Sequence, residues 1–155
     1  MSQAHLHLIF NHYPVILAFV AVILLAFSQR PERTQLMKAG LWIAVAAAVT
    51  FLPAYFTGEG TEEIVEHMPH VNHDLIHNHE EVAEIAIFVF MGMGTLAMVS
   101  LFKLRKGFQA GILWARITLA SLVVCLAMAS GTAFLGSQIS HPEMREGFVG
   151  ESHEN

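Results

Sequence analysis

The chain has little cysteine and little charge. Cys125 is the single cysteine in 155 residues, so no disulfide bond can form within one chain. Only 14% of the residues are charged and the net charge is −5, which leaves no basic patch for nucleic acid. The sequence also lacks a glycine-rich phosphate-binding pattern and a Gly-x-Ser-x-Gly elbow. These absences argue against a disulfide scaffold, a nucleic-acid-binding protein and the common nucleotide-binding or hydrolase motifs.

Apolar residues are abundant instead. Hydrophobic residues make up 54% of the chain, and the mean hydropathy is +0.52. They gather in four stretches at about residues 6–27, 39–56, 85–102 and 111–135. Each stretch is close to the ~20 residues that a helix needs to cross about 30 Å of hydrocarbon. We therefore expect an all-α protein, a four-helix transmembrane bundle, in which residues 1–155 form a single membrane domain.

The basic residues indicate how this bundle is oriented. Seven of the eight lie in or beside the first and third connections: Arg30, Arg33, Lys38, Lys103, Arg105, Lys106 and Arg116. By the positive-inside rule this side faces the cytoplasm. Both termini, the connection 57–84 and the polar tail 136–155 then lie outside. In a bacterial inner membrane that side is the periplasm.

All ten histidines fall on the predicted outer side. They are His5, His7, His12, His67, His70, His73, His77, His79, His141 and His153. Twelve of the thirteen acidic residues, all except Glu32, accompany them. Imidazole is the commonest metal ligand and titrates near neutral pH, and an acidic surface attracts cations. The segregation predicts a metal, haem or proton site on this side.

The segment between the second and third stretches has its own helical signals. Thr57, Gly58 and Gly60 predict an interruption after Phe56, followed by a short interfacial helix over residues 62–68 that Pro69 ends. Asn72 or Asp74 can then cap a helix that continues into the third stretch.

Spacings within this segment predict which ligands share a helix face. Residues three or four apart are neighbours on a helix, which pairs Glu63 with His67, and His77 with His73 and Glu80. Two imidazoles at i and i+4 suit zinc, and mixed imidazole and carboxylate sets suit iron. In the first stretch His7 and His12 point about 140° apart on a regular helix, so they cannot share one small ion.

Three short motifs resemble those of a known family. The stretch His7-Leu-Ile-Phe-Asn-His12-Tyr-Pro14 resembles the His-x4-His-Phe-Pro signature of an uncharacterised family of small bacterial four-span membrane proteins. Thr57-Gly58 and His79 are also similar to that family's pattern, although Tyr13 replaces the usual phenylalanine. Some relatives are fused to c-type cytochrome domains, so the resemblance implies a redox or haem-linked role outside the cytoplasm. It singles out His7, His12 and His79.

Three functional classes follow. The leading one is a metal-binding membrane protein for redox or metal handling, with zinc, copper or iron held at the outer face. The second is a b-type cytochrome in which histidines of the first and third stretches bind haem, and the third is a structural subunit of a larger complex. Expected partners are the lipid bilayer, a metal ion and either a redox protein or a second copy. The candidate ligands are His7, His12 and His79, and then Glu63, His67, His70, His73, His77, Glu80 and His141.

Overall fold

The computed structural model describes residues 3–65 and 72–141, and for residues 3, 4, 59, 60, 62–65 and 140 it describes only the backbone. In these residues the chain is helical and contains no strand. The elements are α1 (Gln3–Phe10), α2 (His12–Phe27), the short 3-10 helix η1 (Pro31–Arg33), α3 (Thr34–Val65), α4 (His73–Leu104) and α5 (Phe108–Ser140). The all-α fold expected from the sequence is confirmed.

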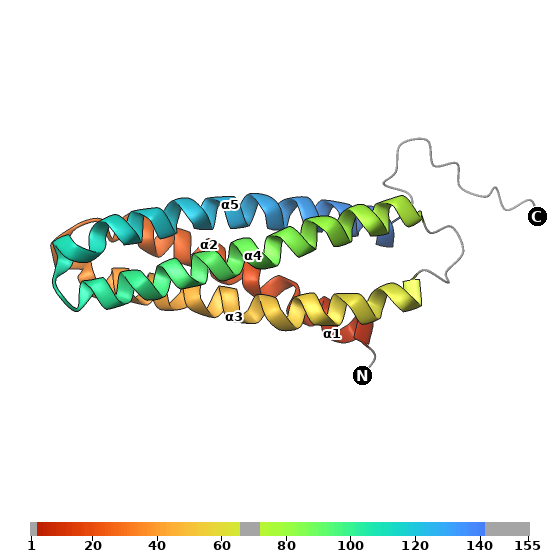
Figure 1. Cartoon of the computed structure of the whole chain (residues 1–155), viewed down its shortest axis with the longest axis horizontal. Coiled ribbons are helices and arrows are strands. Elements are labelled where there is room, and N and C mark those ends of the chain that lie inside the picture. Colours follow the sequence, from red (N-terminus) through yellow and green to blue (C-terminus); the bar gives the residue numbers. More distant parts are fainter. Residues whose placement is uncertain (1–2, 66–71, 142–155) are drawn as a thin grey trace, which may run out of the picture.

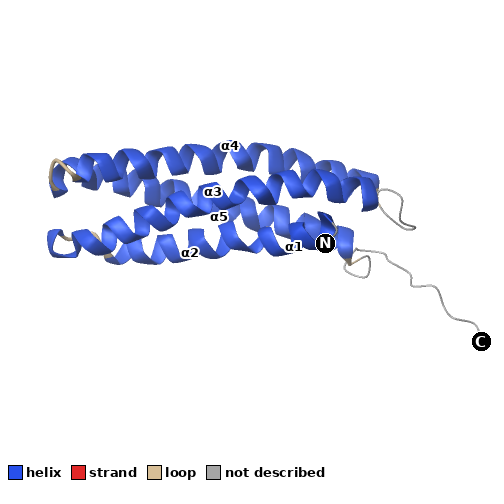
Figure 2. Cartoon of the chain, turned by 90° about the horizontal axis from the view of Figure 1, so that it is seen from below, coloured by secondary structure: helices blue, strands red, loops and turns tan. Residues whose placement is uncertain are grey.

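The long helices form an elongated bundle with one helix at each corner (Figures 1 and 2). Helices α2 and α4 each pack against both α3 and α5, so α2 and α4 lie diagonally opposite one another. Helix α1 leads almost directly into α2 at the same corner and packs against α3. The α2–α3 and α4–α5 connections meet at one end of the bundle, and both described ends of the chain lie at the other.

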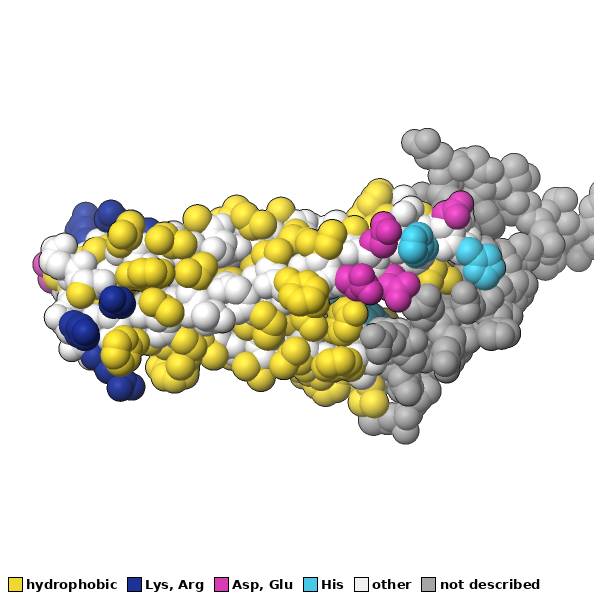
Figure 3. Space-filling model, in the orientation of Figure 1, with side chains coloured by type: hydrophobic (Ala, Val, Ile, Leu, Met, Phe, Trp, Pro, Cys, Tyr) yellow, Lys and Arg dark blue, Asp and Glu magenta, His cyan; other side chains and the backbone are white. Residues whose placement is uncertain are grey.

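Charge separates along the bundle as the sequence predicts. Figure 3 shows the lysines and arginines at the end that holds the two tight connections, which we call the basic end. Acidic side chains and histidines lie at the opposite end, which we call the histidine end. Hydrophobic side chains cover the surface between them.

This middle surface fits a lipid environment. Within the described residues four helices are long and apolar enough to cross a membrane: His5–Phe27, Pro31–Gly58, His73–Leu104 and Phe108–Ile139. Large apolar side chains point outward along them, including Phe88, which is 76% exposed, and Leu113, which is 61% exposed. In water such a continuous apolar surface would drive association, whereas hydrocarbon solvates it.

Small residues let the helices approach closely. Alanines make up much of the buried core, as at Ala21, Ala47 and Ala97. Helices α3 and α4 come closest where Gly94 faces Ala48, and there a Cβ added at Gly94 would lie 2.6 Å from the Ala48 Cβ. Because lipid is as apolar as the core, close packing of this kind is a main source of helix association in membranes.

Specific interhelical contacts supplement this packing. Phe51 and Phe90 stack with ring centroids 4.3 Å apart and join α3 to α4. Nearer the basic end, the buried hydroxyls of Ser100 and Thr118 lie 3.2 Å apart and link α4 to α5.

The start of α4 agrees with the sequence prediction. Asn72 is the N-cap, and its Oδ1 accepts hydrogen bonds from the backbone N–H groups of Asp74 at 2.9 Å and Leu75 at 3.4 Å. The helix then continues without a break into the apolar stretch. At its other end Gly107, with φ of 120°, makes the turn into α5 that a side chain would disfavour.

The segment after Phe56 differs from the prediction. Helix α3 runs without interruption to Val65, so residues 57–60 do not break it and 62–65 are its last turn. Glycine keeps its backbone N–H, and the Thr57 and Thr61 hydroxyls bond back to the carbonyls of Pro53 and Thr57 at 2.6 and 2.8 Å. The helical ladder therefore continues at a cost of about 1 kcal/mol per glycine. Residues 66–68 of the expected short helix lie outside the described residues.

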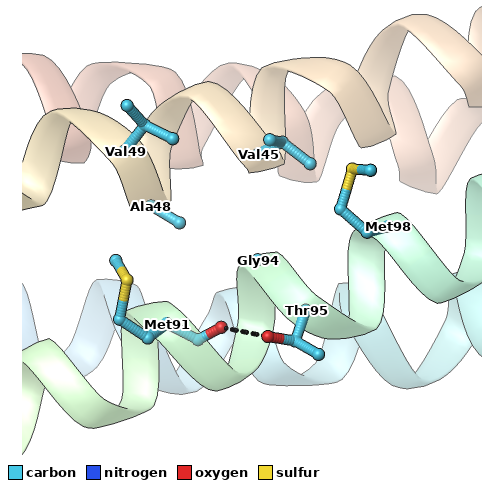
Figure 4. A pocket seen from close by; sticks show the side chains of 7 residues that line it. All are labelled: Val45, Ala48, Val49, Met91, Gly94, Thr95 and Met98. Carbon is cyan, nitrogen blue, oxygen red and sulfur yellow. Dashed lines mark hydrogen bonds between the residues drawn. The ribbon is translucent and has the colours of Figure 1, made fainter.

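An apolar groove lies between α3 and α4 beside their closest approach. Figure 4 shows Met91 and Met98 of α4 across from Val45 and Val49 of α3, with Gly94 between them. Gly94 thus fixes the separation of α3 and α4 and forms the floor of the groove. At Gly92, by contrast, an added Cβ would have no atom within 4 Å.

Replacing Gly94 by alanine should therefore destabilise the bundle. The new Cβ would clash with the Ala48 side chain and force the backbones apart, which costs about 1–3 kcal/mol. Reversible unfolding in detergent measures this loss. Gly92→Ala is the matched control and should change stability little, and equal effects of the two substitutions would contradict the close α3–α4 contact.

Candidate functional site

His7 is held between α1 and α3 near the histidine end. Its ring is half-buried, and Nδ1 lies 2.9 Å from the Ala54 carbonyl oxygen of α3. A carbonyl only accepts hydrogen bonds, so Nδ1 carries a proton, and in the neutral ring Nε2 then keeps its lone pair. The Thr57 hydroxyl lies 3.5 Å from the same Nδ1. His7 is therefore oriented by a neighbouring helix.

Gly58 provides the room for this ring. A Cβ built at Gly58 would lie 3.3 Å from the His7 Cε1 and 3.5 Å from Nδ1. The Nδ1–Cε1 edge of the imidazole thus rests directly on the α3 backbone, one turn beyond Ala54. This contact explains why glycine is acceptable inside a long helix here.

His79 makes the corresponding contact between α4 and α5. A Cβ at Gly136 would lie 3.3 Å from the His79 Cε1 and 3.6 Å from Nδ1. The Thr132 carbonyl, one turn before Gly136, is near enough to interact with the ring. Among the described residues the buried Nδ1 of His79 has no hydrogen-bond partner.

The two histidines face a common region of the bundle. They come from α1 and α4, which belong to diagonally opposite corners. Positive charges on the two rings would repel one another. Because the Nδ1–Cε1 edge of each ring rests on α3 or α5, the remaining edge with Nε2 is turned away from that helix.

Asn11 adds a third polar group on the same helix face as His7, one turn further along. Its side-chain oxygen is buried and has no hydrogen-bond partner within the described part of the chain. Asn11 Oδ1 and His79 Nδ1 are the two buried side-chain atoms left unpaired there. Unpaired buried polar atoms are rare and often mark sites where a further group binds.

The other predicted ligands in the described residues lie elsewhere. His12 is exposed, and its Nδ1 lies 2.9 Å from the Leu8 carbonyl of the preceding turn, so it turns away from His7 as its five-residue spacing predicts. His73 and His77 are exposed at the start of α4, where His77 Nε2 lies 3.4 Å from Glu81 Oε1. Glu80 is half-buried, and His141 is exposed at the end of α5.

The structure describes only part of the expected His/Glu cluster. The side chain of Glu63 and all of His67 and His70 lie outside the described residues. Across residues 3–65 and 72–141, no three His, Cys, Asp or Glu side chains come together in a group that could hold a metal ion. His7 and His79 are the predicted histidine ligands whose rings rest on a neighbouring helix.

Some residues of this site have no sequence signal of their own. Gly136 and the carbonyls of Ala54 and Thr132 are not distinguished by residue type, and Asn11 stands out only once its burial is known. Gly58 belongs to one of the motifs that resemble the bacterial family.

Two such imidazoles can act as ligands to one centre from opposite sides. A ligating histidine commonly donates its second ring N–H to a backbone carbonyl, which fixes the tautomer and the ring orientation. His7 already has this arrangement, and His79 is close to it.

Comparison of the chain with family models, with curated proteins and with solved structures finds no match in any of the three.

Proposed function

We propose that this protein is a membrane electron-transfer protein that binds one b-type haem through His7 and His79. The observation that carries the proposal is that His7 and His79 belong to opposite corners of the bundle and that each ring rests on a glycine of the next helix. Bis-histidine ligation needs one imidazole on each face of a planar macrocycle. Opposite corners supply that arrangement, whereas two histidines on one helix would not.

Haem fits this pair better than a bare metal ion does. A zinc site usually needs three or four protein ligands, but porphyrin supplies four nitrogen ligands and leaves two positions for the protein. Within residues 3–65 and 72–141, no three candidate ligands form a group that could hold a metal ion, whereas His7 and His79 supply two imidazoles. A zinc, copper or iron centre made by His and Glu alone is therefore the weaker proposal.

The residues around the pair suit an apolar cofactor. Ala54 and Ala86 are buried on the inner faces of α3 and α4 near the two histidines. The Phe51–Phe90 stack closes the core closer to the basic end. Bound haem would supply an iron that exchanges one electron, and the protein would orient the imidazoles and exclude water from the iron.

The placement of the site also suits exchange with a partner outside the cytoplasm. The pair lies toward the histidine end, opposite the lysines and arginines. If the basic end faces the cytoplasm, as the positive-inside rule indicates, the haem lies near the periplasmic surface of a bacterial inner membrane. A redox partner protein would meet it there.

Replacing either histidine of the pair should remove bound haem. Each of His7→Ala and His79→Ala deletes an axial ligand, so haem retention should fall by about tenfold or more. The Soret absorbance per mole of protein, purified from cells supplied with haem, measures it. His12→Ala and His77→Ala are controls that remove exposed histidines of α2 and α4. Equal loss in all four variants, or no Soret band in the unchanged protein, would refute the proposal.

The glycine contacts give a second test. In Gly58→Ala and Gly136→Ala the added methyl group would press on the Nδ1–Cε1 edge of a ligand ring and tilt it. We expect haem retention to fall by about tenfold, as for other changes that disturb ligand orientation. The matched control is Gly131→Ala on α5, where an added Cβ meets no atom within 4 Å. Haem loss of the same size in the control would show a general effect on the helix instead.

A further inference from the structure

The buried positions of α2 and α4 repeat at a constant separation. His7 and His79 are 72 residues apart, and so are five successive pairs of buried residues further along the two helices. These pairs are Pro14 with Ala86, Ala18 with Phe90, Ala21 with Met93, Leu25 with Ala97 and Ser28 with Ser100. The repeat therefore includes both the helix packing and the candidate ligand.

Helices α3 and α5 repeat in the same way with a separation of 78 residues. Gly58 and Gly136 have this separation, as do Ala54 and Thr132, whose carbonyls face the two histidines. Five buried pairs share it: Met37 with Ala115, Gly40 with Thr118, Ala44 with Leu122, Ala47 with Cys125, and Phe51 with Ala129. The additional six residues lie between Ser100 and Ala115, where they lengthen the end of α4 and the start of α5.

Seven-residue spacing alone does not explain this agreement. Any two helices of a bundle share a heptad pattern of buried positions, so their cores can be aligned at several separations that differ by seven. The separation of 72 residues also aligns His7 with His79. The separation of 78 residues aligns Gly58 with Gly136, and it aligns the carbonyls of Ala54 and Thr132 as well. The two halves of the chain therefore match in the candidate ligands and in the backbone groups beside them, as well as in their buried positions.

From these matches we infer that the protein consists of two equivalent helical hairpins, and that each supplies one equivalent axial ligand to a closed, six-coordinate haem iron. The inference rests on the proposed function. The first hairpin is α1 and α2 with α3, and the second is α4 with α5. Both run in the same direction through the membrane, so a pseudo-two-fold axis along the bundle relates them, as in other parallel repeats.

The axis determines the coordination of the iron. Rotation about it exchanges α2 with α4 and α3 with α5, which agrees with their places at diagonal corners. It also exchanges His7 with His79. His7 and His79 would then be the two residues that hold the haem, each from one hairpin. Bound in this way the haem would supply one-electron transfer, and neither hairpin would leave a position free for a small molecule.

The two hairpins differ in residue type at most matched positions, and two of these differences lie beside the ligands. Asn11 corresponds to Ala83, and Thr57, whose hydroxyl lies near the His7 ring, corresponds to Leu135. The polarity around the two rings therefore differs, with the more polar side at His7. This asymmetry leaves the ligand pair itself unchanged, because the glycine contact and the nearby carbonyl are kept on both sides.

The test uses the full-length haem protein in detergent. For the unchanged protein we expect a low-spin ferric electron paramagnetic resonance signal, and no change of the reduced Soret band on addition of carbon monoxide. His7→Gly and His79→Gly each open one axial position and are purified with imidazole present, which can fill the gap. Each variant should hold haem with imidazole and should bind carbon monoxide after imidazole is removed, to a similar extent.

The outcomes separate the two proposals. Absence of haem from the unchanged protein would overturn the proposed function and this inference with it. Haem that is high-spin or that binds carbon monoxide in the unchanged protein would overturn the equivalent-ligand inference alone. Imidazole rescue or carbon monoxide binding in only one of the two variants would also overturn it, since the two ligand positions would then not be equivalent.

Discussion

The candidate site depends on the packing of an imidazole edge against a glycine backbone on the next helix. Gly58 gives His7 this contact and Gly136 gives it to His79. A ring buried in an apolar bundle also needs an acceptor for its N–H, because an unsatisfied polar group there is costly. The carbonyl one turn before each glycine lies where this acceptor is needed, at Ala54 and Thr132. The Ala54 carbonyl therefore orients the His7 ring, and the Thr132 carbonyl lies near the His79 ring.

The rest of the bundle makes this arrangement possible. Alanine-rich inner faces and the contact of Gly94 with Ala48 bring the helices close together, while large side chains such as Phe88 face outward. Close helices are needed for a short side chain such as histidine to reach the backbone of its neighbour. The division of charge between the two ends keeps the lysines and arginines away from the histidines. The same packing that stabilises the fold thus positions the candidate ligands.

Much of the fold follows from local patterns in the sequence. Four long apolar stretches predicted four helices, and a helix start was expected at Asn72 or Asp74, of which Asn72 is the cap in the structure. The prediction failed at residues 57–60, where two glycines and a threonine suggested a break that the helix does not have. Propensity describes an isolated helix, but in α3 the threonine hydroxyls bond within the helix and Gly58 is covered by His7. Tertiary contacts decided that segment.

The sequence by itself determined the number of apolar helices, the separation of charge between the two ends, and the gathering of histidines at one of them, because these features depend on residue type and order along the chain. The sequence could not show which two of the histidines form the candidate pair. His7 and His79 are far apart in sequence, and His12 has the same chemistry as His7. Only the tertiary structure decided between them, since whether an imidazole reaches a neighbouring backbone or faces outward depends on helix rotation and on where the next helix carries a glycine.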